Sequence, residues 1–265
     1  EVWQAARQSR SVHRMTFNYR FAAPMLKAKE LIKEGAIGRV FTFRALYLHA
    51  GYVDPNRPMS WRLDVQQGGA GAVADLGAHI FDLVRYLLGD VTGVNAQLET
   101  MIKERPRKDG SGMAEVKVDD MAFVIARLAN GAVGTFEASR LSTGAQDELR
   151  IEIHGDKGAI SFNLMDPNWL HFYDNTAPGS PLGGRKGFTR IETVQRYPEA
   201  NWPGPKFSPG WLRFHVASVY DFLCNVQRGK TGAPSFADGL ACQRLIAACQ
   251  ESSEKQKWVD VAPVE

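Results

Sequence analysis

A run of short segments with the composition of β-strands occupies the middle of the sequence, and it constrains the fold more than any other feature. Turn sequences such as ANG, HGDKG and MDPN separate the segments, and connections this short favour antiparallel neighbours. A further strand rich in β-branched and aromatic residues is predicted at Val40 to His49. The segments of the run are Val94 to Ile102, Val116 to Leu128, Val133 to Ser139, Leu149 to His154, Ala159 to Leu164 and Leu170 to Tyr173. The pattern predicts an antiparallel meander.

Helices are predicted on both sides of this run, from apolar residues at helical spacing. Strands and helices segregated in this way indicate the α+β class, with a mostly antiparallel open sheet covered by helices on one face. Because one sheet face would then lack helices, a second subunit is a natural cover for it. The predicted helices are Ala23 to Glu34, Gln66 to Asp90, Trp211 to Arg228 and Phe236 to Gln256.

Composition narrows the class of protein. The chain has 265 residues, of which 44% are hydrophobic and 23% charged, enough for a sizeable core. Its net charge of +3 is spread without a basic block, so neither a nucleic acid nor a membrane is indicated as a partner. We expect no signal peptide, and the three cysteines form no CxxC pair. We therefore expect free thiols and a cytoplasmic location.

The segment Gln66 to Asp90 carries the most unusual pattern. As one helix it would be apolar except for a single stripe that contains Asp75, His79 and Asp82. A carboxylate one turn from an imidazole is a pairing that raises a histidine pKa and orients the ring. This combination suits proton transfer.

Three interpretations of the stripe remain open. His79 could be a satisfied core histidine with both aspartates paired locally. The three side chains could bind a divalent metal, but a metal site needs three or four convergent ligands and no further His or Cys nearby completes it, so no metal is predicted. The third interpretation, acid–base catalysis by His79 with Asp75, is the one we favour.

Two glycine-rich segments invite comparison with phosphate-binding loops. Gly69 to Ala74 formally matches GxGxxA, but no apolar strand precedes it, and we reject it as a dinucleotide fingerprint. Its glycines would instead allow close approach of a helix N-terminus to another backbone or to a ligand. HGDKGA at His154 to Ala159 is a hairpin turn. The Trp/Pro-rich segment Trp202 to Trp211 could line a sugar pocket or cover the core.

Several segments together resemble a known family. They are FNYRF, KELIKEGAIGRV, SWRLD, GGAGAVADLGAHIFDLVRYLLGD, IEIHGDKGAISF and SFADGLACQRLIAACQESSE, in this order. The sequence in this respect resembles the C-terminal part of the glucose-fructose oxidoreductase and inositol dehydrogenase family (Gfo/Idh/MocA). The most specific part is the D-x-G-x-H-x-x-D run from Asp75 to Asp82. The loop YVDPNRPMSWRLD is most similar to members that act on inositols or anhydro-sugars.

The resemblance implies an NAD(P)-dependent sugar or polyol dehydrogenase. His79 would be the proton acceptor from the hydroxyl whose carbon gives hydride to the nicotinamide, with Asp75 as its catalytic partner. Tyr19 and Arg20 match the segment that faces the cofactor. On the substrate side, Asp54 matches a position where some members contact the polyol. Trp61 and Arg62 in the SWRLD segment are predicted to contact the substrate as well.

The resemblance also implies that a part of the enzyme lies outside these residues. Residues 1–20, a helix and the strand Val12 to Tyr19, would be the remnant of a Rossmann domain, and residues 21–265 the substrate-binding and oligomerisation domain. The resemblance implies that the open sheet face of this second part forms a homodimer or homotetramer. NAD or NADP would be bound mainly by the missing domain, so we expect the chain as given to be inactive. Two alternatives are a cofactor-dependent lyase or glycosidase of the same family and a non-catalytic binding or assembly module.

Overall fold

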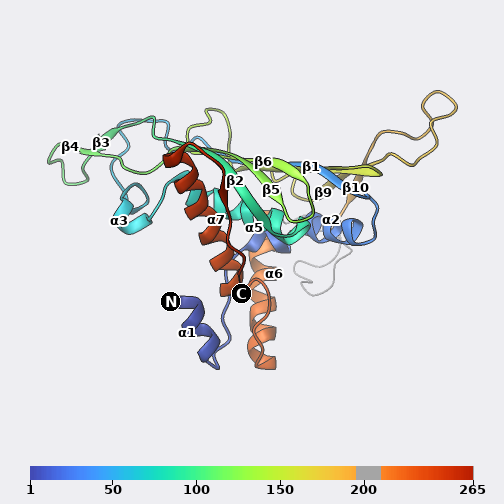
Figure 1. The fold of residues 1–265 in the computed structure, drawn as a ribbon, viewed down its shortest axis with the longest axis horizontal. Coiled ribbons are helices and arrows are strands. Elements are labelled where there is room, and N and C mark those ends of the chain that lie inside the picture. The colour runs from blue at the N-terminus through green and yellow to red at the C-terminus, as the bar shows by residue number, and fades with distance from the viewer. Residues whose placement is uncertain (195–209, 265) are drawn as a thin grey trace.

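The fold is built on one large sheet. The computed structural model describes residues 1–194 and 210–264, and in this part of the chain nine strands form a sheet in the order β10-β9-β8-β7-β1-β6-β5-β2-β11 (Figure 1). The first of these strands are β1 (Val40–Leu48), β2 (Val91–Glu99), β5 (Met121–Leu128) and β6 (Val133–Ser139). The others are β7 (Glu148–Gly155), β8 (Gly158–Asn163), β9 (Trp169–Asp174), β10 (Phe188–Glu192) and β11 (Val259–Asp260).

The prediction of a mostly antiparallel sheet is confirmed, with one departure. β1 lies between β6 and β7 and is parallel to β6, while it is antiparallel to β7. The hairpin prediction for His154 to Ala159 is correct, because β7 and β8 pair directly across it. A separate two-stranded hairpin, β3 (Glu104–Pro106) with β4 (Met113–Glu115), extends from the body and was not predicted.

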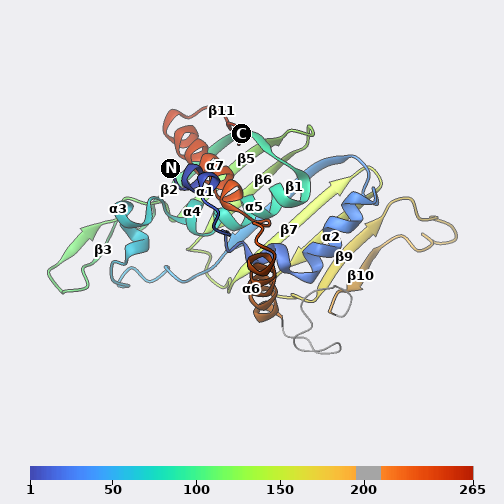
Figure 2. The same ribbon diagram turned by 90° about the horizontal axis from the view of Figure 1, so that it is seen from below.

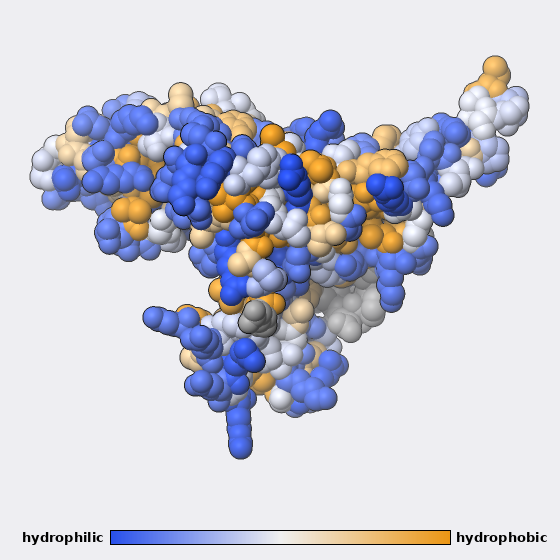
Figure 3. Space-filling view, in the orientation of Figure 1, coloured by the Kyte–Doolittle hydropathy of each residue, from blue (hydrophilic) through white to orange (hydrophobic). Residues whose placement is uncertain are grey.

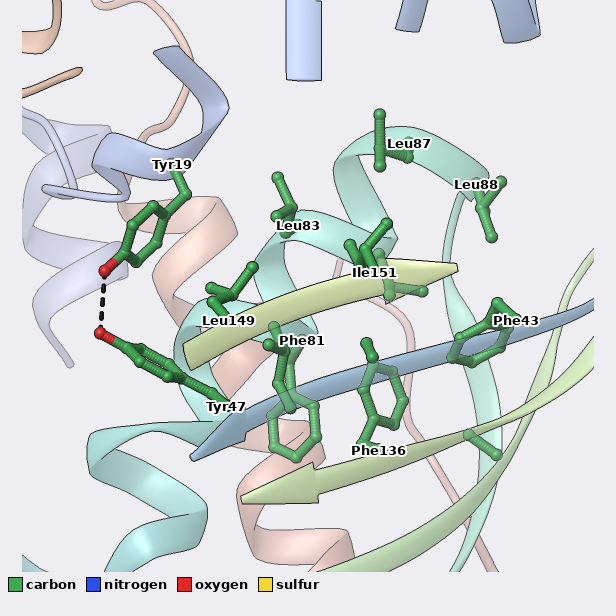
Figure 4. Packing of buried hydrophobic residues seen from close by; sticks show 14 of the residues in the cluster. Tyr19, Phe43, Tyr47, Phe81, Leu83, Leu87, Leu88, Phe136, Leu149 and Ile151 are labelled. Atoms are coloured by element: carbon green, nitrogen blue, oxygen red, sulfur yellow. Dashed lines mark hydrogen bonds between the residues drawn. The ribbon is translucent and has the colours of Figure 1, made fainter. Parts of the chain in front are cut away.

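Helices cover one face of the sheet, as predicted. In Figure 2 the helices α2 (Ala23–Lys33), α5 (Gly77–Leu88) and α7 (Phe236–Lys255) lie in front of the strands. Their buried side chains meet those of the strands in one core, part of which Figure 4 shows around Phe81 and Phe136. None of the helices in the described residues is long and apolar enough to cross a membrane.

The opposite face of the sheet has no helix on it in Figure 1. The side chains of β5 alternate between buried and exposed along the strand, which is the pattern of a sheet covered on one side only. Large apolar side chains on this face remain exposed to solvent. They are Phe41, Phe123, Ile125 and Val133.

The segment predicted as one helix from Gln66 to Asp90 is three helices. They are α3 (Val65–Gly68), α4 (Ala72–Asp75) and α5 (Gly77–Leu88). Gly69 interrupts the path because it has a positive φ of +74°. At Gly71 an added Cβ would lie 1.8 Å from the Asp119 carbonyl oxygen, so only glycine allows this close approach. The single continuous stripe is therefore divided between α4 and α5.

The N-terminal segment departs from its prediction. Helix α1 (Val2–Gln8) is present, but Val12 to Tyr19 forms no strand. A strand requires a paired neighbour, and residues in this segment instead enter the core through Phe17 and Tyr19, with a 3₁₀ turn, η1, at Asn18–Phe21. Helix α1 has no buried residue and projects below the sheet, where it contacts α7. Helix α6 (Trp211–Arg228) also projects from this side of the sheet, and Figure 3 shows apolar residues among polar ones on the projecting part. The prediction of a strand at Val12 to Tyr19 is thus wrong.

Candidate functional site

A pocket of about 380 Å³ opens where β1 ends and α5 begins. It brings together residues from β1, from the loop that follows it, from α4 and α5, and from the segment before β7. The ionisable and aromatic residues in its wall are Tyr47, His49, Tyr52, Arg57, Arg62, Asp75, His79 and Asp147. The structure therefore places the predicted pair Asp75 and His79 in one pocket.

Asp75, at the end of α4, is held by a buried cation. Its Oδ2 accepts a hydrogen bond of 2.9 Å from Arg140, whose side chain is only 1% exposed. The Nε of Arg62 lies 3.7 Å from Oδ1. Arg140 also donates to the carbonyl oxygens of Arg62 and Gly71, which fixes its position. Asp75 is therefore an oriented carboxylate at the pocket wall.

His79 stands in the first turn of α5 among aromatic rings. The rings of Tyr19, Tyr47 and Phe17 lie 5.2, 5.8 and 6.5 Å from the imidazole, centroid to centroid. Its Nδ1 atom is buried and has no hydrogen-bond partner among the described residues. Such an unpaired buried nitrogen is uncommon in a purely structural histidine.

The electrostatic environment of His79 differs from the one predicted. Burial lowers the pKa of the imidazole below 6.5, although the nearby Asp75 and Asp147 act in the opposite direction. Asp75 does act to raise this pKa, as expected, but the expected net increase is wrong because burial has the larger effect. Asp75 is already paired with Arg140, and the helix breaks between the two residues. The imidazole is accordingly uncharged at neutral pH, which is the form that can accept a proton.

Asp82, the last ionisable residue of the stripe, belongs to a different cluster. Arg20 donates to both of its carboxylate oxygens, at 2.7 and 2.5 Å, and also to Asp238 at 2.8 Å. The Asp82 and Arg20 side chains are 2% and 8% exposed. The guanidinium of Arg20 is thus paired inside the fold, and its role as a cofactor contact stays a prediction. Tyr19 does lie against His79.

The structure does not bring all the predicted substrate contacts to the pocket. Arg62 is in its wall, but Asp54 is exposed in the loop after β1, where its carboxylate accepts from the backbone of Asn56. Trp61 lines a separate cavity of about 540 Å³ beside the β3–β4 hairpin. Of the Trp202 to Trp211 segment, residues 202–209 lie outside the described residues.

The glycine-rich lead of α4 has an internal partner. The carboxylate of Asp119 accepts hydrogen bonds from the backbone nitrogens of Gly71 and Val73, at 2.8 and 2.7 Å. The expected close approach is confirmed, and the negative charge at this helix N-terminus comes from the chain itself. The described residues therefore have no dinucleotide loop at this position. They also hold no group of three or more His, Cys, Asp or Glu side chains placed to bind a metal.

Five ionisable or aromatic residues of the pocket wall were not predicted from the sequence, and they are Tyr47, His49, Tyr52, Arg57 and Asp147. Tyr47 and His49 lie at the end of a correctly predicted strand, and residues at strand ends are a general indication of a site. Asp147 lies in the connection between β6 and β7, which enters the pocket because β1 is inserted between those strands. A local sequence pattern contains no information about that insertion.

Comparisons with known proteins agree with this architecture. A family model described as the GFO/IDH/MocA C-terminal domain matches residues 25–161. Levoglucosan dehydrogenase from Pseudarthrobacter phenanthrenivorans is 36% identical over 99% of this chain and 70% of that enzyme. Myo-inositol 2-dehydrogenase from Thermotoga maritima is 27% identical over 94% of this chain and 64% of its own length. The expectation of an inactive chain gains no support from matches that run along nearly its whole length.

Solved structures show the same similarity. A levoglucosan dehydrogenase in complex with NADH and levoglucosan is 37% identical, with a TM-score of 0.90, over 97% of this chain and 68% of that one. A levoglucosan dehydrogenase in complex with NADH and L-sorbose gives a TM-score of 0.92 at 36% identity, over 99% of this chain and 69% of that one. The similarity thus covers nearly the whole chain.

Proposed function

Because the chain belongs to the GFO/IDH/MocA family, we propose that it forms the substrate side of an NAD(P)-dependent oxidoreductase that oxidises a hydroxyl of a sugar or polyol. His79 accepts the proton of the reacting hydroxyl, and Asp75 orients the substrate beside it. Levoglucosan and inositols, which the relatives act on, are the first substrates to test.

One observation carries this proposal. His79 is an uncharged imidazole with an unpaired Nδ1, and it shares a pocket with two carboxylates and two tyrosines. A neutral imidazole accepts a proton readily, and carboxylates and phenols are suited to binding the hydroxyls of a polyol. A histidine kept only for packing would have both nitrogens satisfied or solvated.

We propose that the nicotinamide end of the cofactor binds near His79, on the side of Tyr19. The buried ring of Tyr19 packs against the imidazole of His79, and the orphaned Nδ1 of His79 marks an incomplete polar environment. The bound cofactor would accept the hydride that leaves the substrate carbon. The described residues contain no strand–glycine loop–helix unit that could bind the rest of the dinucleotide. We therefore propose that a further domain binds it. Residues 1–20 would lie at the boundary with that domain, and residues 21–265 would form the substrate-binding and oligomerisation part.

The test is an assay of cofactor reduction. The protein is incubated with NAD or NADP and levoglucosan or myo-inositol, and NAD(P)H is followed by absorbance while the products are identified. Net NAD(P)H with a ketone product supports the dehydrogenase. Cleaved or eliminated product without net NAD(P)H would instead indicate the lyase or glycosidase alternative. Polyol binding in calorimetry with no chemistry under any condition would indicate the binding module.

We also propose that the open sheet face joins copies of the chain. Phe41, Phe123 and Ile125 are 52%, 44% and 47% exposed on it, and apolar side chains gathered on one sheet face mark an interface. Sedimentation of Phe123→Glu tests this, because a charge on this face would shift a dimer or tetramer to a smaller species. A wild-type monomer would contradict the proposal.

A further inference from the structure

A chain of hydrogen bonds runs along the wall of the pocket beside His79. The hydroxyl of Tyr47 donates to Oδ1 of Asp147 at 2.8 Å. The hydroxyls of Tyr19 and Tyr47 lie 2.8 Å apart, and Figure 4 shows them pointing toward each other from η1 and β1. The indole nitrogen of Trp211 lies 3.4 Å from the Tyr19 hydroxyl, a longer contact. The chain thus links residues far apart in the sequence to one carboxylate.

The donor and the acceptor of each hydrogen bond in this series follow from the two groups at its ends. An ionised carboxylate only accepts, so Tyr47 must donate to Asp147. The one proton of Tyr47 is then used, and its oxygen accepts from Tyr19. An indole nitrogen only donates, so Trp211 completes the chain by donating to Tyr19. Neither phenol has a proton left for the substrate or for His79.

The phenols also remain protonated. Burial, with further contributions from Tyr19 and Asp147, raises the pKa of Tyr47 above its usual value, and burial raises that of Tyr19. Their arrangement therefore does not act as an acid–base pair. It fixes the position of the one member of the chain that is exposed in the pocket, Asp147.

Asp147 differs from Asp75 in what its oxygens have left to bind. Both oxygens of Asp75 face arginines, at 2.9 Å from Arg140 and 3.7 Å from Arg62. In Asp147, Oδ1 is held by Tyr47, while Oδ2 has no hydrogen-bond partner among the described residues. An anchored carboxylate with a free oxygen accepts strongly from a hydroxyl, because charge-assisted hydrogen bonds are the strong ones.

We propose that Asp147 is a specificity-determining residue that accepts a hydrogen bond from a second hydroxyl of the substrate, and that Tyr47 and Tyr19 are its positioning residues. The inference rests on the proposed function and deepens it. It assigns the pocket to a sugar or polyol with at least two hydroxyls within reach of one pocket, one at His79 and one at Asp147. A monohydric alcohol would lack this second contact.

The first experiment compares wild type, Asp147→Asn and Glu148→Gln. Steady-state rates are measured with NAD or NADP, levoglucosan and those monodeoxy levoglucosans that still react. Loss of a charge-assisted hydrogen bond is expected to raise KM for levoglucosan about tenfold or more, with kcat changed by less than about threefold. Glu148, whose carboxylate pairs with Arg150 outside the pocket, is the matched control and should leave both constants unchanged.

The monodeoxy derivatives separate recognition from a structural effect. With wild type, one derivative should lose about tenfold in kcat/KM, while Asp147→Asn should treat that derivative and levoglucosan alike. Tyr47→Phe should raise KM in the same direction by a smaller factor. An unchanged KM in Asp147→Asn, or equal discrimination by wild type and Asp147→Asn, overturns the inference.

Calorimetry with levoglucosan makes the two proposals distinguishable. Wild type should bind the sugar without turnover, and Asp147→Asn should bind it about tenfold more weakly. Weaker binding by Asp147→Asn in a protein that reduces no cofactor would support the role of Asp147 and overturn the proposed oxidation. Oxidation by wild type with equal binding by both proteins would overturn the role of Asp147 alone.

Discussion

Two residues of the polar stripe, Asp82 and His79, lie on the same helix, α5, but in different environments. Asp82 lies in a cluster where Arg20 satisfies both carboxylate oxygens and solvent is excluded. One turn earlier, His79 has a buried nitrogen without a partner and faces a pocket. The same helix thus carries a completed ion pair and an incomplete acid–base group. Satisfaction of polar atoms, more than residue type, separates a structural position from a functional one.

Replacing His79 should have the largest effect, and on activity. His79→Gln keeps a polar side chain of similar size but removes the proton acceptor. We expect kcat to fall by about 10²- to 10⁴-fold, the range for losing a general base. Cofactor affinity and the thermal unfolding midpoint should stay near wild type. Stopped-flow or steady-state measurement of NAD(P)H, with calorimetric melting, checks both. Turnover at the wild-type rate would remove His79 from the reaction.

Replacing Asp82 should affect stability. Asp82→Asn leaves the buried Arg20 with one carboxylate, Asp238, in place of two. Breaking a buried pair costs about 3–5 kcal/mol, and the remaining partner places the expected loss at about 3 kcal/mol. Urea unfolding followed by circular dichroism gives the change in free energy.

Asp90, just after the end of α5, provides the matched control for Asp82→Asn. Asp90, 63% exposed, pairs with Arg85 at 2.8 Å, and surface pairs contribute about 0–1 kcal/mol. Asp90→Asn should therefore be nearly neutral. Equal effects of Asp82→Asn and Asp90→Asn would show that burial does not distinguish the two ion pairs. A loss of kcat in Asp82→Asn at constant stability would assign Asp82 a functional role.

Local patterns predicted much of the fold. The strand Val133–Ser139 and the helix Trp211–Arg228 have the predicted bounds, because alternation and helical spacing are written into consecutive residues. The single helix from Gln66 failed, since its interruption depends on the approach of Asp119 to Gly71 from 48 residues away. Contacts of this range have no local pattern.

The candidate site, like the fold, could be predicted only where its residues form a local pattern. Asp75 and His79 could be found because both carry ionisable groups on an otherwise apolar segment. The direction of the His79 pKa could not, because the rings that bury it come from η1 and β1. Arg140 and Asp147 begin and end the β6–β7 connection, and the insertion of β1 between these strands is what no local pattern contains. Asp147 lines the pocket, and Arg140 pairs with Asp75.

The pH dependence of His79 should give the smallest effect and the finest comparison. Burial lowers its pKa, so the acidic limb of kcat/KM should lie below pH 6.5. The unfolded chain takes up this proton near pH 6.5 and the folded one only at lower pH, so stability falls as the pH drops below 6.5. His49 and His215, whose pKa values burial also lowers, add to this loss.

The difference between wild type and His79→Gln isolates the contribution of His79. Urea unfolding at pH 7.5 and pH 5 should show the greater loss of stability in wild type. An acidic limb above pH 6.5 would mean that the charges of Asp75 and Asp147 outweigh burial, and equal losses in both proteins would mean that they balance it. In either case the environment of His79 would stabilise its charged form as well as Arg20 stabilises the carboxylate of Asp82.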